Sequence, residues 1–578
     1  HTTPEKFFLK SESSENEVLV IDRVSHQIAV EDSFKDTLVD TSTSRVVYGL
    51  FGIVHLLAGP YLIVITKISK AAEIYNQIIW KVEETEVLSF CKTTWHLTDE
   101  QVQHNNTYLS MVKSVLATPY FYFSYSYDIS HTLQRLNNAG PDFMTSSLFD
   151  RAEQRFVWNR HLLRDFSTKS ELKPYCIPII HGFISSEVLA INNKVFTWTL
   201  VSRRSILRAG TRMFSRGIDK DGNVSNYVET EQIVEYENSR SSFVQIRGSA
   251  PLFWTQLPNL RYKPPPQLSQ FHNHLEALQK HMESLICNYG KVVVINLVNQ
   301  TGSEHVIEKT LRENLQLLNN SMIRYEAFDF HKECSKMRWD RLSILMNRIS
   351  QEQSEFGYFI TSRDGIVLAS QEGVFRTNCI DSLDRTNVVQ SLIAKRSLED
   401  QLKRFLILAP GEKIGDHPHV ENIYRKVWAD NADFCSIQYA GTGALKTDYT
   451  RTGKRTRSGL IKDGINSLLR YYKNNFADGF RQDSIDLFLG YYKPDENEGK
   501  LSGSPLTDKK DWKYLVLPTI LLGSIAMFFF SMFIPAEHST ETLMYLIFWS
   551  GMVSFSLAVI VYYGGEFVDH PKLCEVRP

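Results

Sequence analysis

Two long apolar stretches near the C-terminus constrain the fold of this chain more than any other feature. Residues 514–534 and 543–563 are almost wholly apolar, and each has about the 20 residues that a helix needs to cross a hydrocarbon core of about 30 Å. The alternative is a pair of buried core helices, which would be unusual at the end of an otherwise mixed sequence. We therefore expect two transmembrane helices over these ranges.

The charges beside these stretches predict their orientation. Three lysines precede the first stretch, and Lys572 and Arg577 follow the second, whereas the connector 535–542 has no Lys or Arg. Cytosolic flanks carry the excess of positive charge in membrane proteins. We therefore expect both termini in the cytosol, with 535–542 as a luminal loop and 564–578 as a cytosolic tail.

A polar segment joins the apolar stretches to the rest of the chain. Residues 494–513 are rich in Asp, Glu, Gly, Ser and Pro, a composition typical of a flexible linker whose ends would lie about 20–25 Å apart. The body, residues 1–493, is therefore expected in the cytosol and close to a membrane surface.

The body divides into two predicted parts, which together indicate a mixed α/β (α+β) fold. Residues 1–180 contain many short β-branched runs and predict a β-rich N-terminal domain, whereas residues 181–493 mix strands with longer helices. The expected strands are 17–22, 27–30, 46–57, 61–66, 195–201 and 292–297. The expected helices are 131–137, 151–163, 305–318 and 341–353.

Charge and cysteine usage exclude several classes of protein. Lys and Arg total 64 and Asp and Glu total 65, a formal net charge of -1, so the molecule has no overall field that would attract nucleic acid. The seven cysteines are scattered and include no Cys-x-x-Cys pair, which argues against a disulfide framework and a cysteine zinc site. No nucleotide-binding or metal-binding motif stands out, so we expect neither a metal nor a cofactor.

Residues 376–387, Arg-Thr-Asn-Cys-Ile-Asp-Ser-Leu-Asp-Arg-Thr-Asn, carry the clearest chemical signal. Five residues separate Cys379 from Arg385, and Thr386 follows. Apolar residues recur with helical spacing from Val389 to Leu406, so the motif is a loop that runs into a helix N-terminus. The unpaired N–H groups and the dipole at that end favour a bound phosphate.

Each residue type in this loop suits the transfer of a phosphoryl group. The electropositive helix end favours the thiolate of Cys379 as a nucleophile. The guanidinium of Arg385 can donate to two phosphate oxygens, and Thr386 can hydrogen-bond to the sulfur. The other expected members of this phosphate-binding loop are Asn378, Ile380, Ser382 and Leu383. The alternative is an inert buried cysteine before a structural arginine.

The departing alkoxide needs a proton, and two carboxyls in the loop could supply it. A carboxyl beside a bound phosphate keeps its proton more readily, because like charges repel. Asp384 is the first choice and Asp381 the second, while either could instead cap the loop amides. The predicted reaction is hydrolysis of a phosphate monoester through a cysteinyl-phosphate.

The motif closely resembles the signature of the Sac-domain (suppressor-of-actin) phosphoinositide phosphatases. Segments 247–254, 328–340 and 439–446 also resemble blocks of that family, so the resemblance covers nearly the whole chain. It implies a β-rich Sac subdomain followed by an α/β domain related to cysteine-based phosphatases. With the paired apolar stretches, it implies an integral membrane protein of the endoplasmic reticulum and Golgi. The implied substrate is phosphatidylinositol 4-phosphate, with the 3-phosphate as a second candidate.

Two details of the loop bear on this resemblance. Ser382 stands where many family members have a second cysteine, a position that is not the nucleophile. The Cys-x-Asp-x-x-Asp-Arg-Thr pattern is also similar to that of myotubularin-type lipid phosphatases, which use the aspartate just before the arginine as the acid. That similarity favours Asp384.

Basic residues outside the loop are candidates for contacts with the lipid. Lys332 and Arg338 could hold the inositol phosphate or brace the fold, and the basic run over 446–462 is either a solvated face or a surface attracted to anionic headgroups. The candidates are Lys332, Arg338, Lys446, Arg451, Lys454 and Arg455. For a second basic group, at positions 203, 204, 208 and 212, the sequence indicates no role.

Two other functions stay open at this point. One is a protein tyrosine phosphatase that uses the same loop chemistry, and the other is a catalytically silent lipid-binding tether. The intact Cys379, Arg385 and Thr386 argue against the silent tether. The sequence ranks neither the phosphate positions on the inositol ring nor action on the chain's own bilayer against action on an apposed one.

Overall fold

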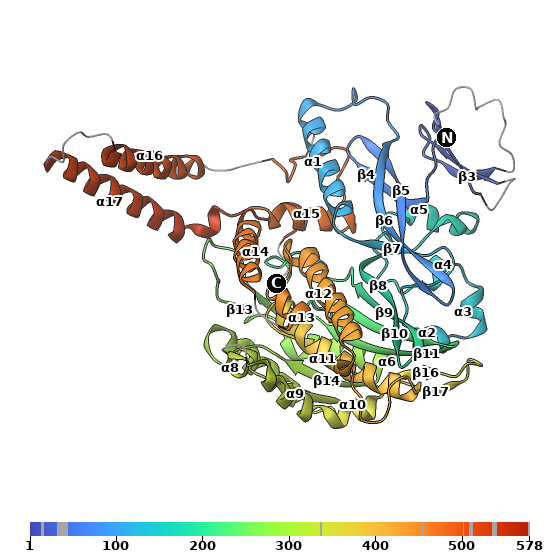
Figure 1. Ribbon diagram of the computed structural model, residues 1–578. Helices are drawn as coiled ribbons and strands as arrows, with labels where there is room; N and C mark the ends of the chain where they lie inside the picture. The colour runs from blue at the N-terminus through green and yellow to red at the C-terminus, as the bar shows by residue number, and fades with distance from the viewer. Residues whose placement is uncertain are drawn as a thin grey trace.

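The computed structural model describes residues 1–12, 17–31, 44–335, 338–453, 456–500, 502–507, 512–533 and 540–575. A mixed α/β body contains a large sheet, and two long helices project from the body as a hairpin (Figure 1). The expected fold class is confirmed: a β-rich N-terminal region, a mixed α/β remainder and two apolar helices that could span a membrane.

The N-terminal region is built from antiparallel hairpins. β5 (Gly59–Ile74) and β6 (Gln77–Ser89) are joined by Tyr75 and Asn76, whose φ angles are 59° and 58°. Two central residues with positive φ give a turn whose twist matches that of the strands. The other strands are β1 (Lys6–Lys10), β2 (Val18–Asp22), β3 (Ile28–Glu31), β4 (Gly49–Leu56) and β7 (Phe121–Phe123). The helices are α1 (Asp99–Leu116), α2 (Leu133–Asn137), α3 (Pro141–Thr145), α4 (Leu148–Arg151), α5 (Arg164–Ser167) and the 3-10 helix η2 (Ser170–Tyr175).

The four strands expected in this region exist as β2, β3, β4 and the first part of β5. The helix expected over 151–163 was wrong, because these residues form successive turns after α4. Their apolar side chains pack in different cores: Phe156 joins one cluster, Trp158 and Leu162 a second, and Val157 and Leu163 a third. Packing in several directions overrides the helical pattern.

One long sheet runs through the body. β4 to β11 follow in antiparallel order, and β18, β14 and β15 continue it with parallel pairing. The sheet is continuous at the expected domain boundary, where Phe121 of β7 pairs with His181 of β8. The strands of this half are β8 (Ile180–Ile191), β9 (Lys194–Arg204), β10 (Val228–Tyr236), β11 (Ser239–Arg247), β12 (Trp254–Thr255), β13 (Gln267–Leu268), β14 (Lys291–Asn296), β15 (Ile323–Ala327), β16 (Phe359–Thr361), β17 (Val367–Ala369) and β18 (Gly373–Asn378).

The parallel end of the sheet contains a switch in strand order. β15 lies on one side of β14 and β18 lies on the other, so the chain leaves neighbouring strands β14 and β18 in different directions. In parallel sheets such a point opens a crevice beyond the carboxyl ends of the two strands, where ligands bind. The segments that follow β14 and β18 therefore meet at this edge.

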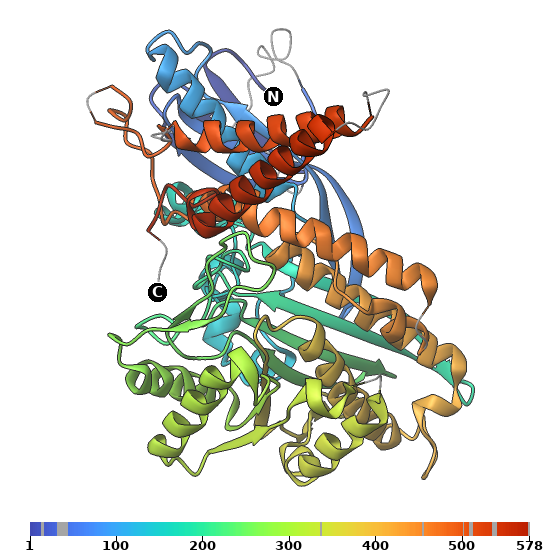
Figure 2. The same ribbon diagram turned by 90° about the vertical axis from the view of Figure 1, so that its left-hand side faces the viewer.

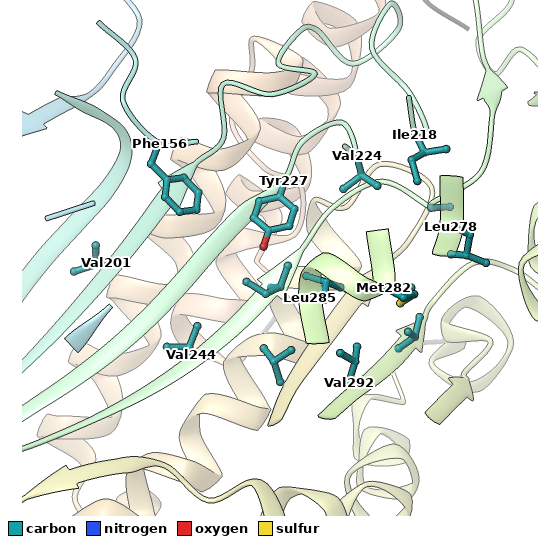
Figure 3. Close-up of a cluster of buried hydrophobic side chains, with 14 of the residues drawn as sticks. Phe156, Val201, Ile218, Val224, Tyr227, Val244, Leu278, Met282, Leu285 and Val292 are labelled. Carbon is teal, nitrogen blue, oxygen red and sulfur yellow. The ribbon is translucent and has the colours of Figure 1, made fainter. Parts of the chain in front are cut away.

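Helices cover both faces of the sheet. Alternate residues of β14 point to opposite faces: Val292 and Val294 join one core and Val293 and Ile295 another. Figure 3 shows the first core, in which Leu278 and Met282 of one covering helix pack beside Val292. The helices are α6 (His274–Tyr289), η3 (Gly302–Glu304), α7 (His305–Leu318), α8 (Phe330–Glu333), η5 (Trp339–Arg341), α9 (Leu342–Arg348), α10 (Ser350–Phe356), α11 (Asp384–Arg404), η6 (Ile414–Asp416), α12 (Pro418–Ala440), α13 (Thr447–Thr452), α14 (Arg457–Phe476) and α15 (Asp478–Phe488).

The expected strands 195–201 and 292–297 correspond to β9 and β14, and the helix expected over 305–318 is α7. The single helix expected over 341–353 is instead two, α9 and α10, separated at Ile349. Ile349 is fully buried and its ψ of 6° departs from helical geometry. Its packing against the core sets the break.

Within the segment expected to be a flexible linker, 494–513, the structure describes residues 494–500, 502–507 and 512–513, and part of it is buried against the body. Glu498 is only 2% exposed and accepts hydrogen bonds from Tyr108 of α1 at 2.5 Å, from Tyr492 at 2.8 Å and from Ser504 at 2.6 Å. A buried carboxylate needs such donors. The segment is therefore attached to α1.

The projecting hairpin consists of α16 (Lys513–Phe533) and α17 (Thr540–Tyr562), close to the two expected spans. The connector 534–539, most of the expected luminal loop, lies outside the described residues. After α17 and the 3-10 helix η7 (Gly564–Glu566), the chain returns to the body. Asp569 donates its N–H to the carbonyl of Asn475 at 2.7 Å, and Asp483 accepts from the N–H of Leu573 at 2.9 Å.

Candidate active site

The Cys379 loop lies at the carboxyl end of β18, beside the switch in strand order. β18 ends at Asn378 and α11 begins at Asp384, so Arg385 and Thr386 lie in the first turn of that helix, as the sequence predicted. Cys379 is 2% exposed. Its sulfur accepts a hydrogen bond from the N–H of Ser382 at 3.2 Å and another from the hydroxyl of Thr386 at 3.6 Å. Two hydrogen-bond donors are therefore aimed at the sulfur.

Buried polar contacts hold the loop in its curled shape. Ser382 has a φ of +51°, a left-handed conformation that is uncommon for residues other than glycine, and its hydroxyl bonds to the carbonyl of Gly248. Arg376 donates to Asn378 at 2.7 Å and to the carbonyl of Ser249 at 2.5 Å. Burial lowers the pKa of Arg376 to about 9. The 247–254 segment therefore holds the loop through the carbonyls of Gly248 and Ser249.

Arg385 reaches across the crevice to the segment that follows β14. Its guanidinium donates to the carbonyl of Leu297 at 3.2 Å, to Asn299 at 3.1 Å and to both carboxylate oxygens of Glu304 at 3.1 and 3.2 Å. Burial lowers the pKa of Arg385, but the neighbouring Cys379 and Glu304 outweigh burial and raise it. Arg385 is therefore a fixed cation beside the sulfur.

Asp381 is fixed between two arginines. Its carboxylate lies 2.9 Å from Arg212 and 2.6 Å from Arg216, and the side chain of Arg216 is only 1% exposed. Burial alone would raise the pKa of Asp381, but the two guanidinium charges hold that pKa well below its ordinary range. Asp381 therefore stays ionised and serves to fix the loop.

Asp384 has different neighbours and faces the cavity. One carboxylate oxygen accepts the N–H of Leu445 at 2.7 Å, and the other lies 3.7 Å from Arg470. Its side chain is 28% exposed. The hydrogen bond to Leu445 orients the carboxyl, while its exposure keeps it accessible to a molecule in the cavity.

The cavity above the loop has a volume of about 380 Å³, within the range of small-molecule sites. Cys379, Asp381, Asp384 and Arg385 line its floor. Its walls come from the 256–266 segment, from α8, from the segment before α13 and from α14. Within the described ranges, no three or more His, Cys, Asp or Glu side chains gather as a metal site would require.

Comparison with known proteins identifies the family. The SacI homology domain matches residues 48–335. The phosphatidylinositol-3-phosphatase SAC1-A of Danio rerio is 52% identical over 576 residues, which cover 100% of this chain and 97% of that protein. The chain belongs to the Sac family. The phosphatidylinositol-3-phosphatase SAC1 of Drosophila melanogaster is 44% identical, over 99% of this chain and 96% of that protein. That of Saccharomyces cerevisiae is 36% identical, over 91% and 85%.

Membership of the Sac family confirms the resemblance read from the loop and supports phosphoinositide phosphatase activity. A lipid substrate follows from that activity. The two apolar helices are consistent with membrane association, by their length and composition.

The structure separates the basic residues that the sequence offered as lipid contacts. Lys446 lines the cavity of this Sac-family site. Lys332 and Arg338 are exposed and do not line it, and Arg338 donates to Ser335. Arg451 is paired with Asp430 at 2.7 Å and Asp433 at 2.9 Å. Lys454 and Arg455 lie outside the described residues.

Several residues of the site were missed by sequence reasoning. Arg212 and Arg216 fix Asp381, Glu304 fixes Arg385, and Arg470 lies beside Asp384. Arg212 lay in a basic group to which the sequence assigned no role. No local spacing could have revealed these partners, because Glu304 is 81 residues from Arg385 and Arg212 is 169 residues from Asp381.

Proposed function

We propose that this protein hydrolyses the phosphate monoester of a phosphoinositide lipid through a cysteinyl-phosphate formed on Cys379. The observation that carries the proposal is the sulfur of Cys379 on the floor of the cavity. Ser382 and Thr386 donate to it, and Arg385 lies in the first turn of α11. A thiolate at a helix N-terminus beside a fixed arginine can attack a phosphorus atom.

The reaction has two steps. The Cys379 thiolate forms a bond to phosphorus, the bond from phosphorus to the inositol oxygen breaks, and Asp384 donates its proton to that oxygen. A water molecule then attacks the cysteinyl-phosphate and gives a proton to Asp384. The sulfur leaves as a thiolate, which Thr386 stabilises, and inorganic phosphate is released.

Arg385 can bind the phosphate without losing its hold on Glu304. A guanidinium has five N–H donors in one plane, and Glu304 orients that plane through two hydrogen bonds. Phosphate oxygens would take the donors that face the sulfur, so Glu304 acts as a positioning residue.

Asp384 suits the role of acid better than Asp381. Asp381 is ionised between Arg212 and Arg216 and has no proton to give. Asp384 faces the cavity with a partly exposed carboxyl. The aspartate directly before the arginine is thus the proposed proton donor.

The proposed substrates are phosphatidylinositol monophosphates. The family resemblance favours phosphatidylinositol 4-phosphate. The Danio, Drosophila and Saccharomyces relatives, however, are named phosphatidylinositol-3-phosphatases. We include both. We also propose that α16 and α17 cross the endoplasmic reticulum and Golgi membranes with both termini in the cytosol.

The test is phosphate release by the full chain in proteoliposomes that contain phosphatidylinositol 4-phosphate or 3-phosphate, with a phosphotyrosine peptide as a third substrate. Cys379→Ser should lower the turnover of the lipids by about 1,000-fold or more. Cys176→Ser is the matched control, because Cys176 is also 2% exposed but lies far from the loop in another core. Ordinary turnover in Cys379→Ser would overturn the mechanism, and turnover of the peptide alone would overturn the substrate class.

A further inference from the structure

The helix α14 is amphipathic in the reverse sense to a helix of a soluble protein. Its buried residues are Gly459, Arg470, Asn474 and Asn475. Seven of its large apolar residues are exposed: Leu460, Ile461, Ile465, Leu468, Leu469, Tyr472 and Phe476. A surface helix normally buries its apolar face and exposes its polar one. A reversed helix needs an apolar environment outside the body.

Most of these side chains form one continuous stripe. Positions 461, 465, 468, 472 and 476 are three or four residues apart, so they share one face of the helix. We call these five residues the apolar stripe. Ile461 is 66% exposed and Leu468 is 73% exposed. A contiguous apolar surface of this kind marks a contact with a protein or a membrane.

The polar face of α14 fixes the rotation of the helix. Arg470 lies beside Asp384 of the catalytic loop and donates to Ser436 at 3.0 Å. Asn475 accepts the N–H of Leu260 at 3.1 Å, and the hydroxyl of Tyr471 donates to the carbonyl of the same Leu260 at 2.6 Å. Turning the stripe inward would break these contacts, so the stripe is held outward.

The C-terminal end of α14 lies at the base of the two-helix hairpin. The carbonyl of Asn475, next to the end of α14, accepts the N–H of Asp569, which lies shortly after α17 ends at Tyr562. Tyr514 at the start of α16 donates to Glu566 at 2.7 Å, so the base of the hairpin is closed. Figure 1 shows α14 on the side of the body from which the hairpin projects, and Figure 2 shows α14 running across the hairpin direction.

Side chains typical of a membrane interface lie at the base of the hairpin. Trp512 is 67% exposed at the start of the hairpin, and Tyr562 is 81% exposed at its end. Aromatic residues of this kind are enriched where spans leave the hydrocarbon. Arg457 and Lys462 on α14 are exposed beside the stripe, where they can meet anionic headgroups.

We propose that α14 lies in the boundary between headgroups and acyl chains of the same bilayer that α16 and α17 cross, with its apolar stripe toward the lipid. This proposal rests on the spans proposed above but not on the catalytic mechanism. Interfacial helices bind membranes with an apolar face in this position. Ser467 and Tyr471 of α14 line the cavity, as do Tyr262 and Lys263, so the rim of the site lies at the lipid surface.

The first test places an environment-sensitive fluorophore on Ile465→Cys in the full chain, in liposomes of phosphatidylcholine with phosphatidylserine, after Cys287→Ser removes an exposed thiol. The matched control is Ile366→Cys. Ile366 is 63% exposed and lies in the hairpin of β16 and β17, which Figure 1 shows on the side of the body away from α16 and α17. We expect a blue-shifted emission that spin-labelled lipids quench at position 465 and neither effect at 366.

Two outcomes would overturn the proposal. A label at 465 that is as accessible to water as the label at 366 would exclude any apolar partner. A label at 465 that is shielded from water but not quenched by spin-labelled lipid would indicate a second protein copy instead of the bilayer.

The second test compares two substrates of different presentation. Ile465→Ser with Leu468→Ser should lower kcat/KM on a bilayer phosphoinositide about tenfold, because each buried apolar side chain contributes to interfacial binding. It should change kcat/KM on a water-soluble short-chain phosphoinositide less than about twofold, and Ile366→Ser should change neither. Equal losses on both substrates would contradict the proposal. If the unmodified chain hydrolyses neither substrate, the proposed function fails, while the fluorescence test still decides the membrane contact.

Discussion

At the residue scale, Asp384 and Asp381 lie three positions apart and have different neighbours. Asp384 faces the cavity, so Asp384→Asn removes the proposed proton donor. We expect kcat/KM for phosphatidylinositol 4-phosphate to fall about 100- to 1,000-fold. An aryl phosphate whose phenolate leaves without a proton should lose less than about tenfold. Equal losses on the two substrates would rule out Asp384 as the acid.

Asp381→Asn should act on stability instead, because it leaves Arg216 buried without its carboxylate. We expect a loss of about 3 kcal/mol in the free energy of unfolding, measured with urea at pH 7. The folded state lowers the pKa of Asp381. The contribution of the Asp381 ion pairs to the free energy of unfolding is therefore fully present above the pKa of Asp381 in the unfolded chain, about 4. It is lost as the pH falls below that value.

The pH dependence gives a control for this assignment. The difference in unfolding free energy between the unmodified chain and Asp381→Asn should shrink as the pH falls below about 4. A difference that stays constant with pH would show that the ion pair with Arg212 and Arg216 is not its source.

At the element scale, the sequence predicted elements whose pattern is set locally. α7 has the expected bounds, 305–318, because Ile307, Leu311 and Leu315 recur with helical spacing and face one core. The two long apolar helices were predicted from their continuous apolar runs, and the helix after Cys379 from its helical spacing. The helix predicted over 151–163 was wrong because the side chains of these residues enter three cores. The attachment of the expected linker could not be predicted, because Glu498 accepts from Tyr108, which is 390 residues away in the sequence.

The residues of the candidate site likewise divide into those that local spacing predicted and those that only the long-range fold brings in. The spacing of Cys379, Arg385 and Thr386 within one loop predicted their meeting at a helix N-terminus. The strand order that brings the segment after β14 beside the loop is a long-range property, and with it come Glu304 and the arginines around Asp381. α14 could not be placed from its pattern, because its reversed faces reproduce the periodicity of a normal amphipathic helix.

Glu498 provides a test of the attached linker. Glu498→Ala leaves the hydroxyls of Tyr108, Tyr492 and Ser504 without their shared acceptor. Hydrogen exchange of the amides over 494–507 should become about tenfold faster, measured by mass spectrometry. Glu496→Ala is the control, because Glu496 is exposed. Unchanged exchange in Glu498→Ala would mean that the linker is held by other contacts.

At the scale of the whole molecule, the body is tied to both ends of the hairpin. The linker before α16 packs on α1, and the tail after α17 packs on α14 and α15. The net charge of -1 gives no general attraction to an anionic membrane. In the proposed arrangement, these attachments and the apolar stripe would orient the cavity toward lipid.

A flexible spacer tests whether attachment of the tail to the body orients the cavity, or whether the two helices only anchor the chain. Twelve Gly and Ser residues inserted between Tyr563 and Gly564 should leave the two proposed spans intact but release the end of α17 from the body. Because a flexible connection lowers the effective concentration of the site at the surface, kcat/KM on bilayer substrate should fall about three- to tenfold. Turnover of a soluble short-chain phosphoinositide should not change. The same insertion between Asp364 and Gly365, in the exposed hairpin of β16 and β17, should affect neither substrate. Full bilayer activity with the first spacer would show that the docked tail does not orient the site.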